Sequence, residues 1–243
     1  MLIGDPAEFA IESCISIAYE ELGARALGYF VIHIGGRCYG VREPDATWMA
    51  CSFDEVKRRL AERGTHTAPF STEPDAGNIA DAQYDARYGP DQGIKEFFGI
   101  PHPEFYDSFY SKHLEWSPGD EEFDDGSSVF HFDVDDRVRL IGFRLKRCED
   151  DYPHDPTIPS SYKGEFHRYQ HDPETLSDIW LEADKFYNIL KTWRDAFETE
   201  WKAVPKPFKA HGPDEHHEQH LAEIDRLAEV SESLRQSRGG GRN

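Results

Sequence analysis

Four histidines toward the end of the chain have the residue type and spacing that could hold a metal ion. They are His211, His216, His217 and His220. Because residues four apart share a helix face, His216 and His220 could grip a divalent cation together. A catalytic zinc site also needs a third ligand and a supporting shell, and the H-E-x-x-H motif is missing. We therefore predict a solvated polar helix here and no metal site.

Asp133, Asp135 and Asp136 form a second group of possible cation ligands. An EF-hand loop needs a glycine at its sixth position and a glutamate at its twelfth, and this segment has neither. Aspartate is common in tight turns, so the simpler interpretation is that Asp135 and Asp136 form the turn of a β-hairpin.

Hydrolytic dyads could be drawn within one polar stretch that contains His154, Asp155, His167, His171 and Asp172. The sequence gives these side chains no geometry, and histidines near aspartates are usually structural. The chain also lacks the phosphate-binding motifs G-x-x-x-x-G-K-[ST] and G-x-G-x-x-G and the nucleophile motif G-x-S-x-G. We therefore predict no catalytic residue, no cofactor and no enzymatic activity.

The charge balance says more about partners. The 243 residues include 27 Lys and Arg and 47 Asp and Glu, which gives a formal net charge of −20. This balance argues against nucleic acid binding through a basic footprint and against docking on an anionic membrane. It suggests that a macromolecular partner of this chain is a basic one.

Two short segments interleave acidic and aromatic residues, and we predict that they contact the partner. They comprise Glu121, Glu122, Phe123, Asp124 and Asp125, and Glu149, Asp150, Asp151 and Tyr152. Clustered charges steer the encounter of two proteins, and aromatic rings anchor the complex once they are desolvated. The alternative is that this charge serves only solubility.

The elements that would position these residues indicate an α+β fold built on antiparallel hairpins. Residues 9–19 alternate as a half-buried strand does, with Phe9, Ile11, Ile15, Ile17 and Tyr19 on one face. Residues 27–41 predict a hairpin, because glycines at its centre supply the positive φ of a tight turn. Residues 129–145 predict a second hairpin, with a β-bulge near Gly142 where the apolar phase slips by one residue.

Helices are expected to pack on this antiparallel sheet. The capping pair Ser52 and Glu55 predicts a helix over 53–63, with Gly64 at its C′ position. A long amphipathic helix is predicted over 173–202, with Asp172 as its N-cap. Between them, residues 65–128 are expected to be an irregular, packed insertion with a short helix over 78–88.

The predicted organisation is a single α+β domain over 1–204, followed by a proline-linked amphipathic helix and a disordered tail over 205–243. The first residues have no basic region and no long apolar run, so they do not form a secretory signal. No stretch approaches the ~20 apolar residues of a membrane span. We therefore expect the protein in the cytoplasm, without a membrane association.

The opening Ile3-Gly4-Asp5-Pro6, with Phe9-Ala10-Ile11 and the hairpin turn Gly35-Gly36, resembles the immunity protein 42 family of bacterial polymorphic toxin systems. The late helical run with Phe186-Tyr187, Leu190 and Trp193 fits the same family, so the resemblance spans roughly residues 1–202.

The resemblance implies a non-enzymatic protein that is encoded beside a toxin and protects the producing cell by binding that toxin. It implies no catalytic residues. Three alternatives stay open at this point. They are an acidic decoy that imitates nucleic acid and inhibits a DNA- or RNA-binding protein, a metal-dependent hydrolase that uses the histidine cluster, and a structural module.

Overall fold

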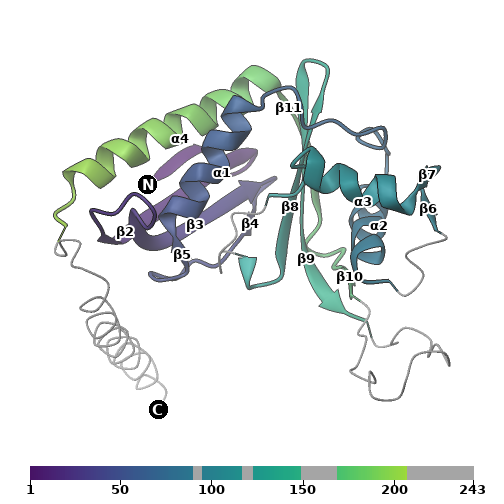
Figure 1. Ribbon diagram of the computed structural model, residues 1–243, viewed down its shortest axis with the longest axis horizontal. Helices are drawn as coiled ribbons and strands as arrows, with labels where there is room; N and C mark the ends of the chain where they lie inside the picture. The colour runs from purple at the N-terminus through teal and green to yellow at the C-terminus, as the bar shows by residue number, and fades with distance from the viewer. Residues whose placement is uncertain (90–94, 117–122, 149–168, 207–243) are drawn as a thin grey trace, which may run out of the picture. The chain divides into compact units, whose positions relative to one another are not determined.

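Two antiparallel sheets with helices packed on them account for the part of the chain that the computed structural model describes, residues 1–89, 95–116, 123–148 and 169–206 (Figure 1). The predicted α+β class is confirmed, including a long C-terminal helix. Met1–Pro205 form one compact unit. The helix and the four histidines predicted beyond residue 206 lie outside the described residues.

The first sheet has the strand order β1-β2-β3-β4, and a short β5 also pairs with β3. These strands are β1 (Leu2–Asp5), β2 (Phe9–Ala18), β3 (Ala26–Ile34), β4 (Arg37–Tyr39) and β5 (Thr47–Trp48). The hairpin turn predicted at Gly35 and Gly36 is confirmed, with φ of 59° and 82°. The single apolar face predicted for β2 is wrong in its second half, because the register shifts between Ile15 and Ile17 and buries Ala18.

The second sheet is built around one long strand that pairs on both of its edges. Its strands are β8 (Ser127–Val134), β9 (Arg137–Arg147), β10 (Tyr169–His171) and β11 (Ser177–Glu182). The hairpin β8–β9 is confirmed, and its turn holds Asp135 at φ 54°. The predicted bulge near Gly142 is wrong, because pairing runs without a shift from Ser127 with Arg144 to Val134 with Arg137.

The apolar residues on both sides of β8 and β9 explain that error. Val129, Val138 and Leu140 belong to a core shared with the first sheet and α4, whereas Phe130 and Ile141 belong to a second core under α2 and α3. A strand that is buried on both faces carries apolar side chains on both, so its sequence shows a phase slip without any bulge.

Four helices complete the described residues. They are α1 (Met49–Ala61), α2 (Ala76–Tyr88), α3 (His102–Ser111) and α4 (Ala183–Ala203), and a small hairpin of β6 (Glu96–Phe97) and β7 (Ile100–Pro101) precedes α3. Helices α1 and α4 lie side by side over the first sheet, and α2 and α3 pack at the second (Figure 1). The short helix predicted over 78–88 is confirmed as α2, whereas α3 was not predicted within the stretch 65–128, which was expected to be otherwise irregular.

The starts predicted for the first and the last of these helices are wrong. Helix α1 begins at Met49, so Ser52 and Glu55 lie inside it and are buried instead of capping it, and Gly64 lies beyond its C-cap Glu62. The predicted N-cap Asp172 is also wrong, because residues 177–182 form β11 and α4 begins after Glu182. That segment satisfies the backbone groups along the edge of β9, and edge pairing outweighs its helical periodicity.

Candidate functional site

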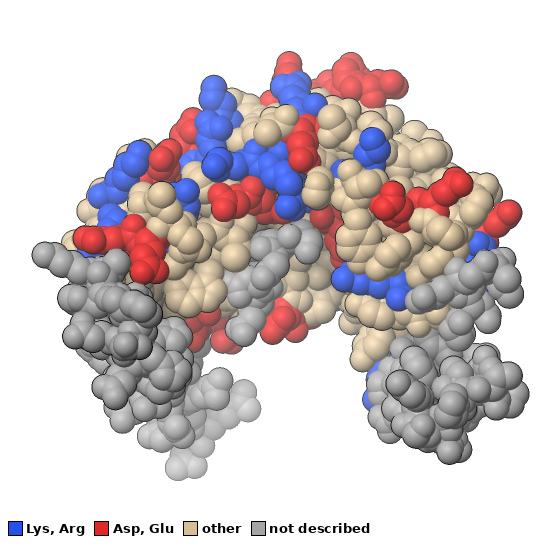
Figure 2. Space-filling model, viewed as in Figure 1, with Lys and Arg blue, Asp and Glu red and all other residues tan. Residues whose placement is uncertain are grey.

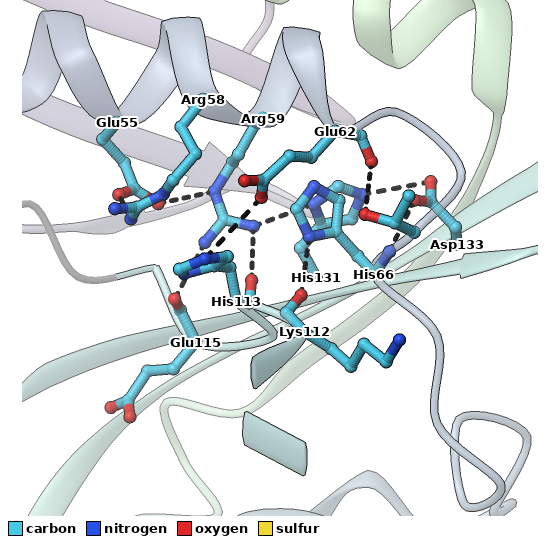
Figure 3. A network of polar contacts seen from close by, with 11 residues as sticks. Glu55, Arg58, Arg59, Glu62, His66, Lys112, His113, Glu115, His131 and Asp133 are labelled. Atoms are coloured by element: carbon cyan, nitrogen blue, oxygen red, sulfur yellow. Dashed lines mark hydrogen bonds and ion pairs between the residues drawn. The ribbon is translucent and has the colours of Figure 1, made fainter. Parts of the chain in front are cut away.

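A buried arginine lies at the centre of a polar network between α1 and the second sheet (Figure 3). The Arg59 side chain is fully buried, and its Nε donates to Glu55 Oε1 at 2.8 Å, one helical turn earlier. Its two terminal nitrogens donate to the backbone oxygens of His113, at 3.1 Å, and Glu115, at 2.8 Å. The guanidinium also lies 4.3 Å from the Trp116 ring centroid. One side chain thus ties α1 to the segment that follows α3.

His131, in the middle of β8, continues the network. Its Nδ1 accepts from Arg59 Nη1 at 2.9 Å, which leaves the proton of the neutral ring on Nε2. Burial, the nearby Arg59 charge and the His66 ring lower the pKa of His131 to about 3, although the Asp133 carboxylate acts in the opposite direction. His131 is therefore a neutral acceptor at physiological pH.

Asp133 accepts hydrogen bonds from three further donors of the network. Its Oδ2 accepts the backbone N–H groups of Gly64, at 2.8 Å, and His66, at 3.1 Å, and its Oδ1 accepts the Tyr187 hydroxyl at 2.7 Å. Burial alone would raise the pKa of Asp133, but the His131 and Tyr187 side chains and the His66 N–H outweigh it and lower this pKa to about 2. Asp133 is therefore an ionised anchor for the loop after α1 and for α4.

This network has the geometry of a structural clamp. His131 and Asp133 are 3.4 Å apart, as in a catalytic dyad, but His131 is fully buried and carries no proton-accepting lone pair that a substrate could reach. Among the described residues, no group of three or more His, Cys, Asp or Glu side chains is placed to hold a metal ion. The network joins α1, β8, α4 and the segment at 112–116.

Asp133 and Tyr187 also line a surface pocket of about 610 Å³, which we call the acidic pocket. Its lining residues are Arg63, Gly64, Asp133, Asp135, Asp136, Glu182, Ala183, Asp184, Lys185 and Tyr187. Both cations are engaged, since Arg63 pairs with Asp184 at 2.5 Å and Lys185 pairs with Glu8. The pocket therefore presents a surplus of carboxylates at the β8–β9 turn, where it could receive cationic groups.

The sequence indicated this pocket only in part. The sequence groups Asp133, Asp135 and Asp136 as possible cation ligands. The turn predicted at Asp135 and Asp136 is present. Glu182 and Asp184 were missed because the sequence pattern placed them inside one continuous helix. The start of α4 beside the hairpin turn brings the two sets together, and the backbone bond from Ala183 N to Asp136 O fixes it.

The predicted partner-contacting segments are described only in part. Phe123 is half-buried against the first core, and Asp124 is exposed. Asp125 accepts the Ser127 N–H at 3.0 Å and pairs with Arg144 at 3.0 Å, so it also stabilises the start of β8. Glu121, Glu122 and the second segment, 149–152, lie outside the described residues.

Of the histidines considered for hydrolytic dyads, His171 is described, and its partner is not Asp172. His171 Nδ1 lies 2.8 Å from Asp81 Oδ1, and the same oxygen accepts the His171 backbone N–H at 2.9 Å. Asp172 takes no part in this pair, and it accepts the Glu174 N–H in a turn. The contact therefore ties β10 to α2. His154 and His167 lie outside the described residues.

Comparisons with known proteins place this fold in a family. The immunity protein 42 profile matches residues 1–196, and the chain belongs to that family. A crystal structure of CdiI from Burkholderia dolosa AUO158 is 17% identical, covers 81% of this chain and 99% of its own, and superposes with a TM-score of 0.46. No curated protein matches the chain.

Proposed function

We propose that this chain is a non-catalytic immunity protein that binds and neutralises a cognate toxin, and so protects the cell that makes both. The observation that carries this proposal is the family match over residues 1–196, which spans both sheets and most of α4. The buried clamp supports it, because the histidine–aspartate pair in the fold stabilises structure and is not open to a substrate.

We propose further that the toxin presents a basic surface. The formal net charge of −20 and the carboxylates of the acidic pocket support this proposal. Figure 2 shows that the visible face is mixed, with Lys and Arg gathered among Asp and Glu near its centre, so contact sites are local patches rather than a whole face. We propose the segments 121–125 and 149–152 as contacts in addition to the pocket.

No helix among the described residues is long and apolar enough to cross a membrane. We propose that the protein acts in the cytoplasm, where a toxin that enters or is made in the cell would meet it.

Co-expression tests the proposal. The chain and the product of the neighbouring toxin gene are expressed together in a bacterium, and growth and co-purification are scored. We expect rescue of growth and a stable complex. A toxin that kills in the presence of the chain would contradict the proposal. Capture of a DNA- or RNA-binding protein that belongs to no toxin system would favour the nucleic-acid decoy instead.

The role of the acidic pocket is tested with the purified pair. The variant D136K/E182K reverses two pocket charges, and E43K/D45K reverses two exposed charges elsewhere as a matched control. We expect the pocket variant to slow association about 10-fold at low salt, because charge complementarity acts on the encounter rate. Equal association rates for the two variants would contradict the pocket assignment.

A further inference from the structure

A continuous line of aromatic contacts runs across α3 and α2. We call it the tyrosine ladder, and it comprises Phe97, His102, Tyr106, Tyr110, Arg87 and Tyr88. The ring centroids of Phe97 and His102 are 6.2 Å apart, those of His102 and Tyr106 are 5.9 Å apart, and those of Tyr106 and Tyr110 are 4.9 Å apart. The Arg87 guanidinium continues the line, 6.0 Å from the Tyr110 ring centroid and 5.4 Å from that of Tyr88.

Two of the three tyrosines of the ladder face solvent, and Tyr106 is half-buried. Tyr88 is 49% exposed and Tyr110 is 44% exposed, which places them among the few large hydrophobic side chains at the surface of the described residues. Scattered exposed rings are ordinary, but rings in mutual contact make a patch, and exposed patches of this kind mark interaction sites. Tyrosine and arginine are also the residue types that contribute most to binding energy at interfaces.

Hydrogen bonds, an ion pair and the buried side of α3 fix the side chains of the ladder. The Tyr106 hydroxyl donates to the Tyr110 oxygen at 3.0 Å, and Arg87 pairs with the partly buried Glu115 at 3.4 Å. Phe105 and Phe109, on the opposite side of α3, are buried in the second core. Because these contacts already fix the side chains, little conformational entropy is lost when a partner covers them.

The charges beside the ladder favour a cationic partner, because Arg87 is already paired with Glu115 and two further carboxylates lie on α3. Asp107 precedes Tyr110 by three residues and Glu104 precedes Asp107 by three, so they are neighbours on the surface of α3. Both carboxylates are exposed, and no ion pair joins either of them to another described residue. Tyrosine rings attract the guanidinium or ammonium groups that such carboxylates also bind.

We propose that the tyrosine ladder is a docking surface for the basic face of the cognate toxin, which presents Arg or Lys side chains to the tyrosine rings and to Glu104 and Asp107. This inference rests on the proposed function. A second copy of the chain fits the surface poorly, because two molecules that each carry a formal net charge of −20 repel one another.

The test measures binding of the purified full-length chain to the toxin by surface plasmon resonance, after thermal melting has confirmed that each variant folds. We expect Y88A/Y110A to raise Kd by about 30-fold or more, mainly through faster dissociation, because buried aromatic anchors govern complex lifetime. The control L22A removes a side chain that is 64% exposed at the β2–β3 turn, and it should change Kd by less than about 2-fold.

A charge-reversal pair provides a second test that leaves the rings in place. We expect E104K/D107K to slow association about 10-fold at low salt, with the difference shrinking as salt is added, whereas E43K/D45K should leave the rate unchanged. Wild-type affinity in Y88A/Y110A would contradict the proposal that the toxin docks on the tyrosine ladder. So would light scattering that shows a wild-type dimer which Y88A/Y110A dissociates. Neither result would contradict the proposed function. Failure of the wild-type chain to bind the toxin would overturn the proposed function as well.

Discussion

Arg59 is the single side chain whose loss should cost most. Its charge is fully buried against Glu55 and serves two backbone carbonyls and His131. We expect R59M to lower the free energy of unfolding by about 3–5 kcal/mol, because it leaves Glu55 Oε1 and two backbone carbonyls in the interior without their donor. Arg58 still pairs with the other Glu55 oxygen in this variant. Urea unfolding monitored by tryptophan fluorescence would measure this loss.

A double variant separates the loss of the pair from the loss of packing. In E55L/R59M no buried charge is left behind at these positions, so the combined loss of unfolding free energy should be smaller than the sum of the single losses. An R59M variant within about 1 kcal/mol of the wild type, or strictly additive losses, would contradict the clamp.

The buried histidines should make stability depend on pH. Burial lowers the pKa of His131 from 6.5 to about 3, and the pKa of His66 is lowered in the same direction by burial and the Arg59 charge. Between these values the unfolded chain binds a proton that the folded chain does not. The free energy of unfolding should therefore fall as pH drops from about 6.5 toward 4, by up to about 1.4 kcal/mol per pH unit from His131. His66 adds to this fall in the same direction.

The variant H131Q keeps a polar side chain near Arg59 but cannot titrate. Its unfolding free energy should fall less steeply over the same pH range, with the remaining slope contributed by His66 and other groups. Urea titrations at several pH values compare the two slopes. Equal slopes in H131Q and the wild type would show that His131 is not neutral in the fold. Asp133 adds a separate loss below pH 3.8, because its pKa is lowered to about 2.

At the scale of elements, the sequence predicted the two hairpins, whose turns are determined locally. The hairpin at Gly35 and Gly36 follows from alternation and from glycine's access to positive φ. The boundary between β11 and α4 could not be predicted, because residues 177–182 pair with a strand some forty positions away and their own periodicity is helical. Long-range edge pairing is invisible in a local pattern.

The candidate site shows the same division. The hairpin turn at Asp135 and Asp136 was predicted from residue type alone. The clamp could not be predicted, because in the sequence Arg59 is one of several charged residues on an amphipathic helix. Its partners come from the segment after α3 and from β8, which only the fold brings to it. The tyrosine ladder could not be predicted for a related reason, since its residues come from β6, α2 and α3, and of these only α2 was expected.

Gly142 gives a prediction about how the two sheets pack. A Cβ added there would lie 2.4 Å from the Tyr39 ring, whose hydroxyl donates to Thr175 O at 2.6 Å. We expect G142A to lower the free energy of unfolding by about 1–3 kcal/mol, because the ring must leave its place between β4 and β9. Thermal melting would measure this change.

The matched control is G23A. Nothing lies within 4 Å of a Cβ at Gly23, and its φ is not in the left-handed region. This variant should be neutral or slightly more stable, because alanine reduces the entropy of the unfolded chain. G142A as stable as G23A would mean that the Tyr39 ring can move without cost.

At the scale of the whole molecule, β8 and β9 form the wall that two cores share. Val129 and Leu140 face the core under α1 and α4, and Phe130 and Ile141 face the core under α2 and α3. The clamp lies on the first side of this wall and the tyrosine ladder on the helices of the second. Substitutions that disrupt the packing of β8 and β9 should therefore destabilise both cores, which we expect to unfold in one cooperative transition.

The same organisation predicts what removal of the last residues does. We propose residues 1–204 as one domain and 205–243 as a separate segment, because both described cores are complete by Val204 and the family match ends at residue 196. A chain that ends at Lys206 should melt within about 2 °C of the full chain, since it loses none of these buried contacts. It should also bind the toxin with unchanged Kd, because it keeps the acidic pocket and the tyrosine ladder. Intact melting with lost affinity would place a further contact beyond residue 206, whereas a lower Tm would show that the later residues belong to the domain.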